Sequence, residues 1–430
     1  MGGGRSRDER RAEPSRLRLR LGPALGCVFA LFLLAVSLSA CANGNPDDGG
    51  PESGPRTLTI YSSLPLHGPD RERSRDMVNA IKLALEESNG KIGPLSITYV
   101  SLDSATAEQG TWTKDSVLDN ARQAVRDPNT IAYIGDLESA ATALALPLTN
   151  EGHILHISPS STYVGLTRAS RRQGEPERFY PAGRRTFGRM VPTDHVQASA
   201  LVGYMKEEGV RSLALMADRD LDGGGLADQI ATAAAGQGMT VSNLGQIDPQ
   251  AVDLSGPAAK VAQAGADAFL FAGVPDAGAA RVFSAVAAAA PNLLLFAPGA
   301  GAEGAFAQAL PAAVQRRMRL TSPTLPPRLL PASARAFRAR FRAAVGRYPV
   351  PEALQAYEAT NVILSSIRSA GAMGNNRLAV VDKFFATRDR PSVLGKYTID
   401  RFGDTSLSTY AGDRLRRSRL VLDTVLKVRP

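Results

Sequence analysis

Short apolar segments recur along the chain at positions that predict β-strands. Most are continuous runs of aliphatic and β-branched residues rather than alternating ones, which is typical of strands covered on both faces of a sheet. Nine strands are predicted, at Leu58–Tyr61, Leu95–Leu102, Ile131–Ile134, Ile154–Ser158, Phe187–Val191, Leu213–Met216, Met239–Leu244, Ala268–Phe271 and Leu293–Phe296.

Between these strands, apolar residues recur with the spacing of an α-helix. Strands that alternate with helices at intervals of about 25 to 38 residues are typical of βαβ units and therefore of parallel sheets. Nine strands over 430 residues fit two lobes better than one, so the predicted fold is α/β with two doubly wound parallel-sheet lobes. The two clearest helical stripes are Met77, Ile81, Ala84 and Leu85, and Val117, Leu118, Ala121, Ala124 and Val125.

Small hydroxyl residues follow several of the predicted strands. Doubly wound sheets bind ligands in the crevice beyond the carboxyl ends of their strands. Helix N-termini in that crevice present free backbone N–H groups and a partial positive charge, which suit a carboxylate or another anion. A single serine there is more often only a helix cap, whereas several on one crevice favour a binding site. The segments are Ser62–Pro65, Asp103–Ser104, Gly135–Ser139 and Ser158–Thr162.

The N-terminal region has the pattern of an export signal. Twenty uncharged residues, Leu21–Ala40, follow the arginine-rich run Arg16–Arg20. The end of this tract, Leu38-Ser39-Ala40-Cys41, resembles the bacterial lipoprotein signal, which implies a lipid on the Cys41 sulfur and cleavage before it. An uncleaved membrane helix is the alternative, because twenty apolar residues just span a bilayer. We expect residues 1–40 to be a signal peptide and residues 41–56 to be a lipidated flexible tether.

The charge of the chain is less informative about partners than it first suggests. The 430 residues are 44% hydrophobic and 21% charged, with a net charge of +9. The first forty residues hold seven Arg against three acids, so a nucleic-acid partner is not predicted for the remaining chain. Both cysteines, Cys27 and Cys41, lie in the leader region. Their position excludes a disulfide, a Cys-ligated zinc and a cysteine nucleophile from the folded body.

Five segments of the chain form an ordered pattern: Ile134-Gly135 with Ser139-Ala140, HILHISPSST (153–162), RMVPTDHVQASAL (189–201), AGADAFLFAG (264–273) and VLGKYTIDRFGDTSLSTY (393–410). By the order and spacing of these segments, the chain resembles, from about Thr57 to Val428, the leucine/isoleucine/valine-binding family of type I periplasmic binding proteins, the solute receptors of ABC importers. That family implies two α/β lobes joined by a hinge of three crossovers, with a ligand between lobes that close around it.

The resemblance also implies where the chain passes between the lobes. We expect crossovers near Met190–Val191, Thr321–Ser322 and Pro391–Ser392. These boundaries assign residues 57–190 plus 322–391 to the N-terminal lobe, and residues 191–321 plus 392–430 to the C-terminal lobe.

In this family, residues at the positions of Ser139, Ser161 and Thr162 receive the ligand carboxylate, partly through backbone N–H groups. Ser160 lies between them in sequence. The second lobe departs from the family pattern: Asp222-Gly223 replaces a frequent Tyr-Gly, Gly299 replaces an acid suited to an α-ammonium, and Val274 replaces an aromatic residue. Asp222, Glu303 and Glu138 are the acids that could instead bind an α-ammonium group. The candidate ligand-binding residues are therefore Ser139, Ser160, Ser161, Thr162, Glu138 and Asp222.

Other chemistries have weaker support in the sequence. Gly299–Gly304 matches a dinucleotide fingerprint, but no acid lies about 20 residues further on to bind a ribose. His153 and His156 flank a predicted strand on opposite faces, so they do not predict a metal site. No Gly-x-Ser-x-Gly motif is present. We expect no enzyme activity, no cofactor and no metal, and we interpret the arginines between Arg168 and Arg189 as a solvated surface segment.

These observations predict a lipid-anchored receptor on the outer face of a bacterial cytoplasmic membrane. It would capture a small carboxylate-bearing metabolite, such as a branched-chain amino acid, an amide or a related compound, and pass it to ABC permease subunits. Two alternatives stay open: a ligand-sensing lipoprotein without transport, and an envelope interaction protein whose cleft no longer binds a ligand.

Overall fold

The computed structural model describes residues 56–299, 302 and 304–428. The predicted signal peptide, Cys41 and nearly all of the predicted tether lie outside the described residues. None of the helices in the described part of the chain combines the length and the apolar character that crossing a membrane requires.

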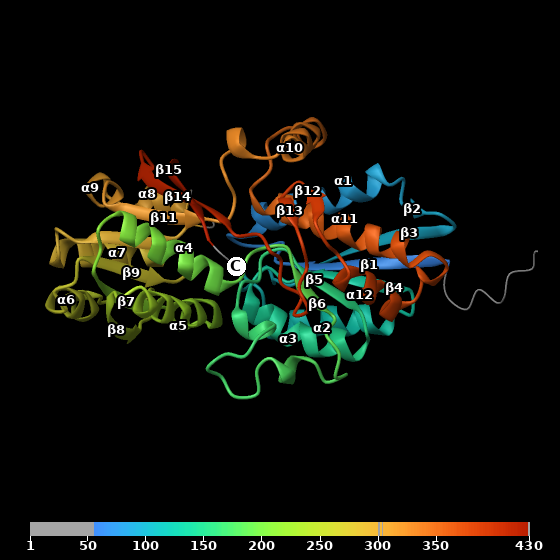
Figure 1. Ribbon diagram of the computed structural model, residues 1–430, viewed down its shortest axis with the longest axis horizontal. Helices are drawn as coiled ribbons and strands as arrows, with labels where there is room; N and C mark the ends of the chain where they lie inside the picture. Colours follow the sequence, from blue (N-terminus) through green and yellow to red (C-terminus); the bar gives the residue numbers. More distant parts are fainter. Residues whose placement is uncertain (1–55, 300–301, 303, 429–430) are drawn as a thin grey trace, which may run out of the picture. The chain divides into compact units, whose positions relative to one another are not determined.

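The first sheet contains six strands within the described residues, in the order β2-β3-β1-β4-β5-β6 (Figure 1). All neighbours are parallel except β2 and β3. Because β1 lies between β3 and β4, the strand order reverses there, and the crevice of a doubly wound sheet forms at such a point. The strands are β1 (Thr57–Leu64), β2 (Lys91–Ile92), β3 (Leu95–Asp103), β4 (Thr130–Gly135), β5 (Leu155–Ser158) and β6 (Phe187–Arg189).

The second sheet contains seven strands within the described residues, in the order β15-β14-β11-β10-β9-β7-β8. The run from β8 to β11 is parallel, and the two C-terminal strands add to it antiparallel. Its order reverses between β7 and β9. The strands are β7 (Ser212–Ala217), β8 (Thr240–Gln246), β9 (Ala268–Ala272), β10 (Leu294–Pro298), β11 (Met318–Ser322), β14 (Thr409–Arg416) and β15 (Arg419–Lys427); β12 (Arg390–Ser392) and β13 (Gly395–Tyr397) form a separate hairpin.

Helices cover both faces of each sheet, which explains the continuous apolar runs. In β7, Leu213 and Leu215 pack with α4 and α5, whereas Ala214 and Met216 pack with α6 and α7 on the other face. The helices are α1 (Arg71–Glu87), α2 (Lys114–Arg126), α3 (Ser139–Glu151), α4 (Asp194–Glu207), α5 (Leu221–Gly236), α6 (Ser255–Gln263), α7 (Ala277–Ala289), α8 (Ala305–Ala309), α9 (Ala312–Gln315), α10 (Ala332–Val345), α11 (Glu352–Ala370) and α12 (Arg377–Phe385), with short 3₁₀ turns at Val164–Leu166, Glu177–Phe179, Pro327–Leu329 and Gly371–Met373.

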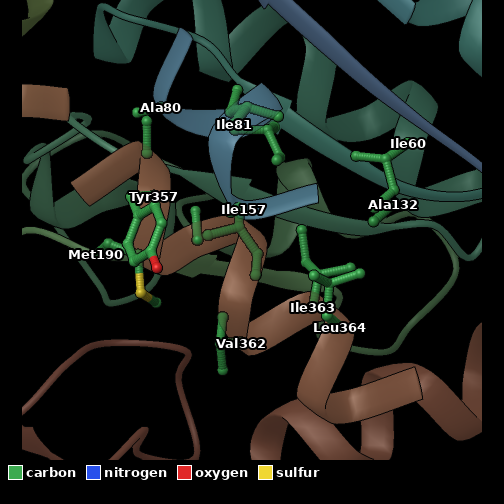
Figure 2. Packing of buried hydrophobic residues seen from close by; sticks show 14 of the residues in the cluster. Ile60, Ala80, Ile81, Ala132, Ile157, Met190, Tyr357, Val362, Ile363 and Leu364 are labelled. Atoms are coloured by element: carbon green, nitrogen blue, oxygen red, sulfur yellow. The ribbon is translucent and has the colours of Figure 1, made fainter. Parts of the chain in front are cut away.

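The core of the first lobe is built from two distant parts of the chain. Figure 2 shows Ile60 of β1, Ala132 of β4 and Ile157 of β5 gathered with Ile81 of α1 and Ile363 of α11. All five side chains are fully buried. The chain therefore returns to the first lobe after it has built most of the second, as the predicted fold requires.

All nine predicted strands are present, and the α/β fold with two parallel-dominated sheets is confirmed. The prediction missed β11, β14 and β15 because charged residues interrupt their apolar runs. In β11, Arg319 is buried, and its guanidinium donates to Oε2 of Glu208 at 2.7 Å. An ion pair inside a strand removes the apolar pattern by which a buried strand is predicted.

We propose that the third crossover lies later than Pro391–Ser392, between Thr405 and Thr409. Tyr397 and Ile399 pack in the first core, and the backbone N–H of Arg189 in β6 donates to the carbonyl of Gly403 at 3.1 Å. These contacts keep the segment up to that point in the first lobe.

Candidate functional site

In each lobe, a helix begins at the point where the strand order of the sheet reverses. In the first lobe, α3 follows β4 and begins at Ser139. In the second lobe, α5 follows β7 and carries Asp222 in its first turn. The two helix starts meet, because the backbone N–H of Ser139 donates to Oδ2 of Asp222 at 3.2 Å.

The Ser139 hydroxyl organises the neighbouring loop. Its Oγ accepts hydrogen bonds from the backbone N–H groups of Thr162 and Tyr163, each at 3.2 Å. The structure thus brings Ser139 and Thr162 together at the N-terminus of α3, as the predicted site requires.

Two other predicted residues direct their hydroxyl groups into the first lobe. Ser161 is buried, and its Oγ lies 2.7 Å from Oγ1 of Thr142. The Ser160 hydroxyl donates to the carbonyl of Leu137 at 2.6 Å. These side chains fix the loop between β5 and the following 3₁₀ turn. The backbone N–H groups of Ser160 and Ser161 are also engaged, because they donate to Oγ of Ser158 at 3.2 and 2.9 Å.

The carboxylate of Asp222 is held where the sequence predicts a ligand carboxylate. Burial raises the pKa of Asp222, while the hydrogen bonds from Ser139 oppose that rise. The N-terminus of an α-helix stabilises a negative charge through its free N–H groups and its dipole. The site therefore already binds one carboxylate, which belongs to the protein itself.

Three further acids lie close to this contact. Burial raises the pKa of Glu138 to about 8, with Asp70 adding to the rise and Arg73 opposing it. Burial also raises the pKa of Asp194 to about 7, and the charge of Asp222 adds to the rise. Asp218, at the end of β7, has its pKa raised to about 6, again mainly by burial. These raised pKa values show that burial in the crevice around Asp222 makes negative charge unfavourable.

The sequence prediction missed two buried acids of this region. Asp194 begins α4 directly after the position predicted for the first crossover, and Asp136 follows β4. Both are almost fully buried, and each has one carboxylate oxygen without a hydrogen-bond partner in the described residues. Their position directly after a crossover or a strand was the available signal, since such segments line the crevice.

Arg189 corrects the interpretation of the arginine-rich segment as a solvated surface. Its side chain is fully buried and forms an ion pair with Asp404 at 3.0 Å. The same guanidinium donates to the carbonyls of Ser161 and Tyr163, at 2.8 and 3.1 Å, and to Oγ1 of Thr167 at 2.9 Å. Arg189 thus holds the loop of the candidate site, whereas Arg171 and Arg184 are exposed as expected.

Two of the positions where the second lobe departs from the family pattern, Gly299 and Val274, carry no acidic side chain. A side chain at Gly299 would meet Oγ of Ser322 at 2.8 Å, so this position has little room. Val274 is 54% exposed. Glu303 lies outside the described residues, as does part of the glycine-rich match around it.

His156 has a structural role. It is fully buried, with Nε2 2.8 Å from the Gly135 carbonyl and Nδ1 3.0 Å from Oγ1 of Thr149. Burial lowers its pKa to about 3, so the ring is neutral. Within the described residues, no group of three or more His, Cys, Asp or Glu side chains has an arrangement that would hold a metal ion.

A cavity of about 250 Å³ lies beside the contact between α3 and α5. Tyr163 and Arg171 line it from the first lobe, and Gly225 and Asn243 line it from the second. None of the six predicted site residues lines this cavity. The Asp222–Ser139 contact itself leaves no space for a ligand carboxylate at the amide of Ser139.

The comparisons with known proteins agree with this architecture. The family model described as periplasmic binding protein matches residues 57–406. No curated protein matches the chain in sequence.

Several solved structures have the same fold. A leucine-binding protein, LivK, from Thermotoga maritima is 20% identical with a TM-score of 0.72, and the match covers 86% of this chain and 99% of that one. The LivJ protein of Streptococcus pneumoniae, in complex with isoleucine, is 19% identical with a TM-score of 0.69, covering 87% and 100%. A solute-binding protein from R. palustris, in complex with benzoate, is 17% identical with a TM-score of 0.69, covering 87% and 98%.

The family match spans most of the chain, and the matched structures have the same fold. The resemblance inferred from the sequence is thereby confirmed. The chain belongs to the periplasmic binding protein family and has the type I periplasmic binding protein fold.

Proposed function

We propose that the protein is a lipid-anchored, extracytoplasmic solute receptor of an ABC importer and that it captures a small carboxylate-bearing metabolite. The observation that carries this proposal is the carboxylate of Asp222 on the backbone N–H of Ser139. It indicates that the start of α3 is suited to a carboxylate in this chain. An amino acid or an aromatic acid presents the same group.

The ligands of the structural relatives support this ligand class. Isoleucine and benzoate, bound by the proteins from S. pneumoniae and R. palustris, differ in size and polarity but share a carboxylate. Asp222, Val274 and Gly299 differ from the residues that the family pattern has at these positions of the second lobe. The part of the ligand other than its carboxylate is therefore undetermined. Binding and lobe closure, rather than a reaction, would then be the work of the protein, with ABC permease subunits as the recipient.

The site assignment predicts the effect of a double substitution. Ser139→Ala with Thr162→Ala removes two hydroxyl groups from the crevice, and hydrogen bonds to a charged acceptor contribute about 1.5 to 3 kcal/mol each. We expect at least a tenfold loss of affinity, measured by calorimetry. The probe is the compound that most stabilises the wild type in a thermal-shift panel of amino acids, amides and organic acids.

The matched control removes the same groups from the surface. Ser199 and Thr232 lie on exposed positions of α4 and α5, and their hydroxyl groups bond only to carbonyls of their own helices. Ser199→Ala with Thr232→Ala should leave affinity unchanged. Equal affinity of both double variants would refute the site assignment.

The same experiment separates the alternative functions. If no compound of the panel stabilises the protein and no metabolite co-purifies with it, the envelope interaction protein with a degenerate cleft is favoured, because a ligand at 100 times its Kd stabilises by about 2.7 kcal/mol. If a ligand binds but a deletion strain takes up labelled ligand normally, the sensing receptor is favoured over the importer.

A further inference from the structure

The Asp222–Ser139 contact is part of a larger face of α5 that lies on the first lobe. Leu221 packs against the apolar cluster around Leu146 and Tyr163. Gly225 lies so close to Tyr163 that a Cβ would come within 2.5 Å of its ring. The positions 221, 222 and 225 follow helical spacing, so they form one side of the helix.

An exposed ion pair extends this face by one turn. Asp228 accepts a hydrogen bond from the Arg171 guanidinium at 2.9 Å. Because 228 lies three and seven residues after 225 and 221, the same side of α5 supplies four successive contacts. The position of Asp222 on the α3 N-terminus is therefore fixed by its helix and does not depend on a single hydrogen bond.

Within the described residues, the backbone N–H of Ser139 donates to Asp222 and to no other acceptor, because it lies at the start of a helix. The first N–H groups of an α-helix lack intrahelical partners and are satisfied by caps, water or ligands. Glu138, at the N-cap position of α3, makes no side-chain capping bond. The carboxylate of Asp222 therefore takes the place that a ligand carboxylate would take on Ser139.

We infer that Asp222 is an internal competitor for the carboxylate site, a role that rests on the proposed function. In the absence of ligand, its carboxylate holds the N–H of Ser139 and keeps α5 on the first lobe. A ligand carboxylate binds only by displacing it. The affinity for a carboxylate is then reduced by the free energy of the contact that must first be broken.

Charge makes this competition selective. Glu138 directly precedes Ser139, whose N–H donates to Asp222, and Asp220 lies two residues before Asp222, so both carboxyl groups lie near it. Asp194 and Asp218 also interact electrostatically with Asp222. A simple anion that displaces Asp222 adds a negative charge to this group, whereas a zwitterion brings an ammonium that offsets it. Asp222 therefore disfavours simple acids more strongly than amino acids.

The first test needs no ligand. Hydrogen exchange at the Ser139 amide, resolved by NMR, should be at least tenfold faster in Asp222→Ala than in the wild type, because the only acceptor of that N–H has been removed. Asp220→Ala is the matched control: Asp220 precedes α5, is exposed and makes no capping bond. An unchanged Ser139 exchange rate in Asp222→Ala would overturn the inference.

The second test measures selectivity with a matched pair of probes, L-leucine and 4-methyl-2-oxopentanoate, which differ in the ammonium group. Asp222→Asn, which keeps the shape of the side chain, should increase the affinity for the oxo acid at least tenfold and change the affinity for leucine much less. A ratio of affinities equal to that of the wild type and of the control Glu86→Gln, at an exposed position of α1, would overturn the selectivity.

The two tests distinguish this inference from the proposed function. If neither probe binds to any variant while Ser139 exchange accelerates in Asp222→Ala, the contact is established as an internal lock and the proposed ligand class is wrong. If probes bind with unaltered affinity and Ser139 stays protected, the proposed function stands and the competitor role is wrong.

Discussion

At the scale of single residues, Asp136 shows how strongly the crevice disfavours charge. It is fully buried, its Oδ1 accepts a hydrogen bond from the Tyr133 hydroxyl at 3.3 Å, and its Oδ2 has no partner in the described residues. Burial raises its pKa to about 7. The folded protein thus keeps a proton on Asp136 at pH values where the unfolded chain has lost it.

This difference predicts that Asp136→Asn increases the free energy of unfolding relative to the wild type, by an amount that depends on pH. Between about pH 4 and pH 7 the unfolded wild type is ionised while the folded one is not, so stability contributed by neutral Asp136 is lost as pH rises. We expect the free energy of unfolding of the variant to rise relative to that of the wild type over this range. At pH 8 the difference should be roughly 1 kcal/mol or more. Urea unfolding at several pH values measures the difference.

The control for Asp136→Asn is Glu86→Gln, at an exposed position of α1. It measures the effect of replacing a carboxylate at the surface by an amide. If the Asp136→Asn difference from the wild type were independent of pH, Asp136 would be ionised in the folded protein and the argument from burial would fail.

Residue positions were more predictable than side-chain directions. Ser139 and Thr162 meet at the α3 N-terminus because strand order alone places the ends of β4 and β5 side by side. The hydroxyl groups of Ser160 and Ser161 turn into the lobe, towards Leu137 and Thr142. The direction of these hydroxyl groups depends on the conformation of the loop, which the spacing of apolar residues does not predict.

At the scale of elements, β6 links the candidate site to the third crossover. Its last residue, Arg189, joins the loop carbonyls of Ser161 and Tyr163 to Asp404. The arginine is thus a shared anchor for two segments that lie more than 200 residues apart in the sequence. Its burial could not be predicted, because neighbouring arginines of the same segment are exposed.

The anchor predicts a large loss of stability in Arg189→Met. The substitution removes the partner of Asp404 Oδ1, while Oδ2 keeps its ion pair with Arg168 at 2.8 Å. It also removes the guanidinium that donates to the carbonyls of Ser161 and Tyr163. Breaking a buried ion pair destabilises by about 3 to 5 kcal/mol. Denaturant unfolding should detect this loss, and adding Asp404→Asn should recover part of it.

An exposed arginine of the same segment provides the comparison for Arg189. Arg184 forms an ion pair with Asp382 at the surface, so Arg184→Met should change stability by less than about 1 kcal/mol. Similar losses in Arg184→Met and Arg189→Met would mean that burial of Arg189 does not determine its contribution.

At the scale of the whole molecule, the strand and helix pattern predicted the two-lobe fold because both sheets are covered on both faces. Each parallel strand then carries a continuous apolar run, and the helices between them carry a stripe. The antiparallel additions β14 and β15 escaped prediction because Asp413 and Arg414 interrupt the apolar run of β14 and Asp423 interrupts that of β15.

Anchoring also belongs to this scale. If Cys41 carries a lipid, the full-length protein should partition into the detergent phase and incorporate labelled fatty acid in its host, since two acyl chains give stable membrane attachment. Cys41→Ser should do neither, and Cys27→Ser should behave like the wild type. Labelling that persists in Cys41→Ser would place the attachment elsewhere.

The glycines at the start of α5 connect lobe contact with ease of release. Gly225 would place a Cβ 2.5 Å from Tyr163 of the first lobe, so a larger residue there would force the lobes apart, whereas Gly223 would place one 2.0 Å from Oδ1 of Asp218 within the second lobe. With Gly224, they form a run of three residues that each disfavour an α-helix by about 1 kcal/mol relative to Ala. The glycines that allow Asp222 to approach Ser139 thus also make the first turn of α5 easy to unwind. The same three residues therefore permit the contact with α3 and make that contact easy to break.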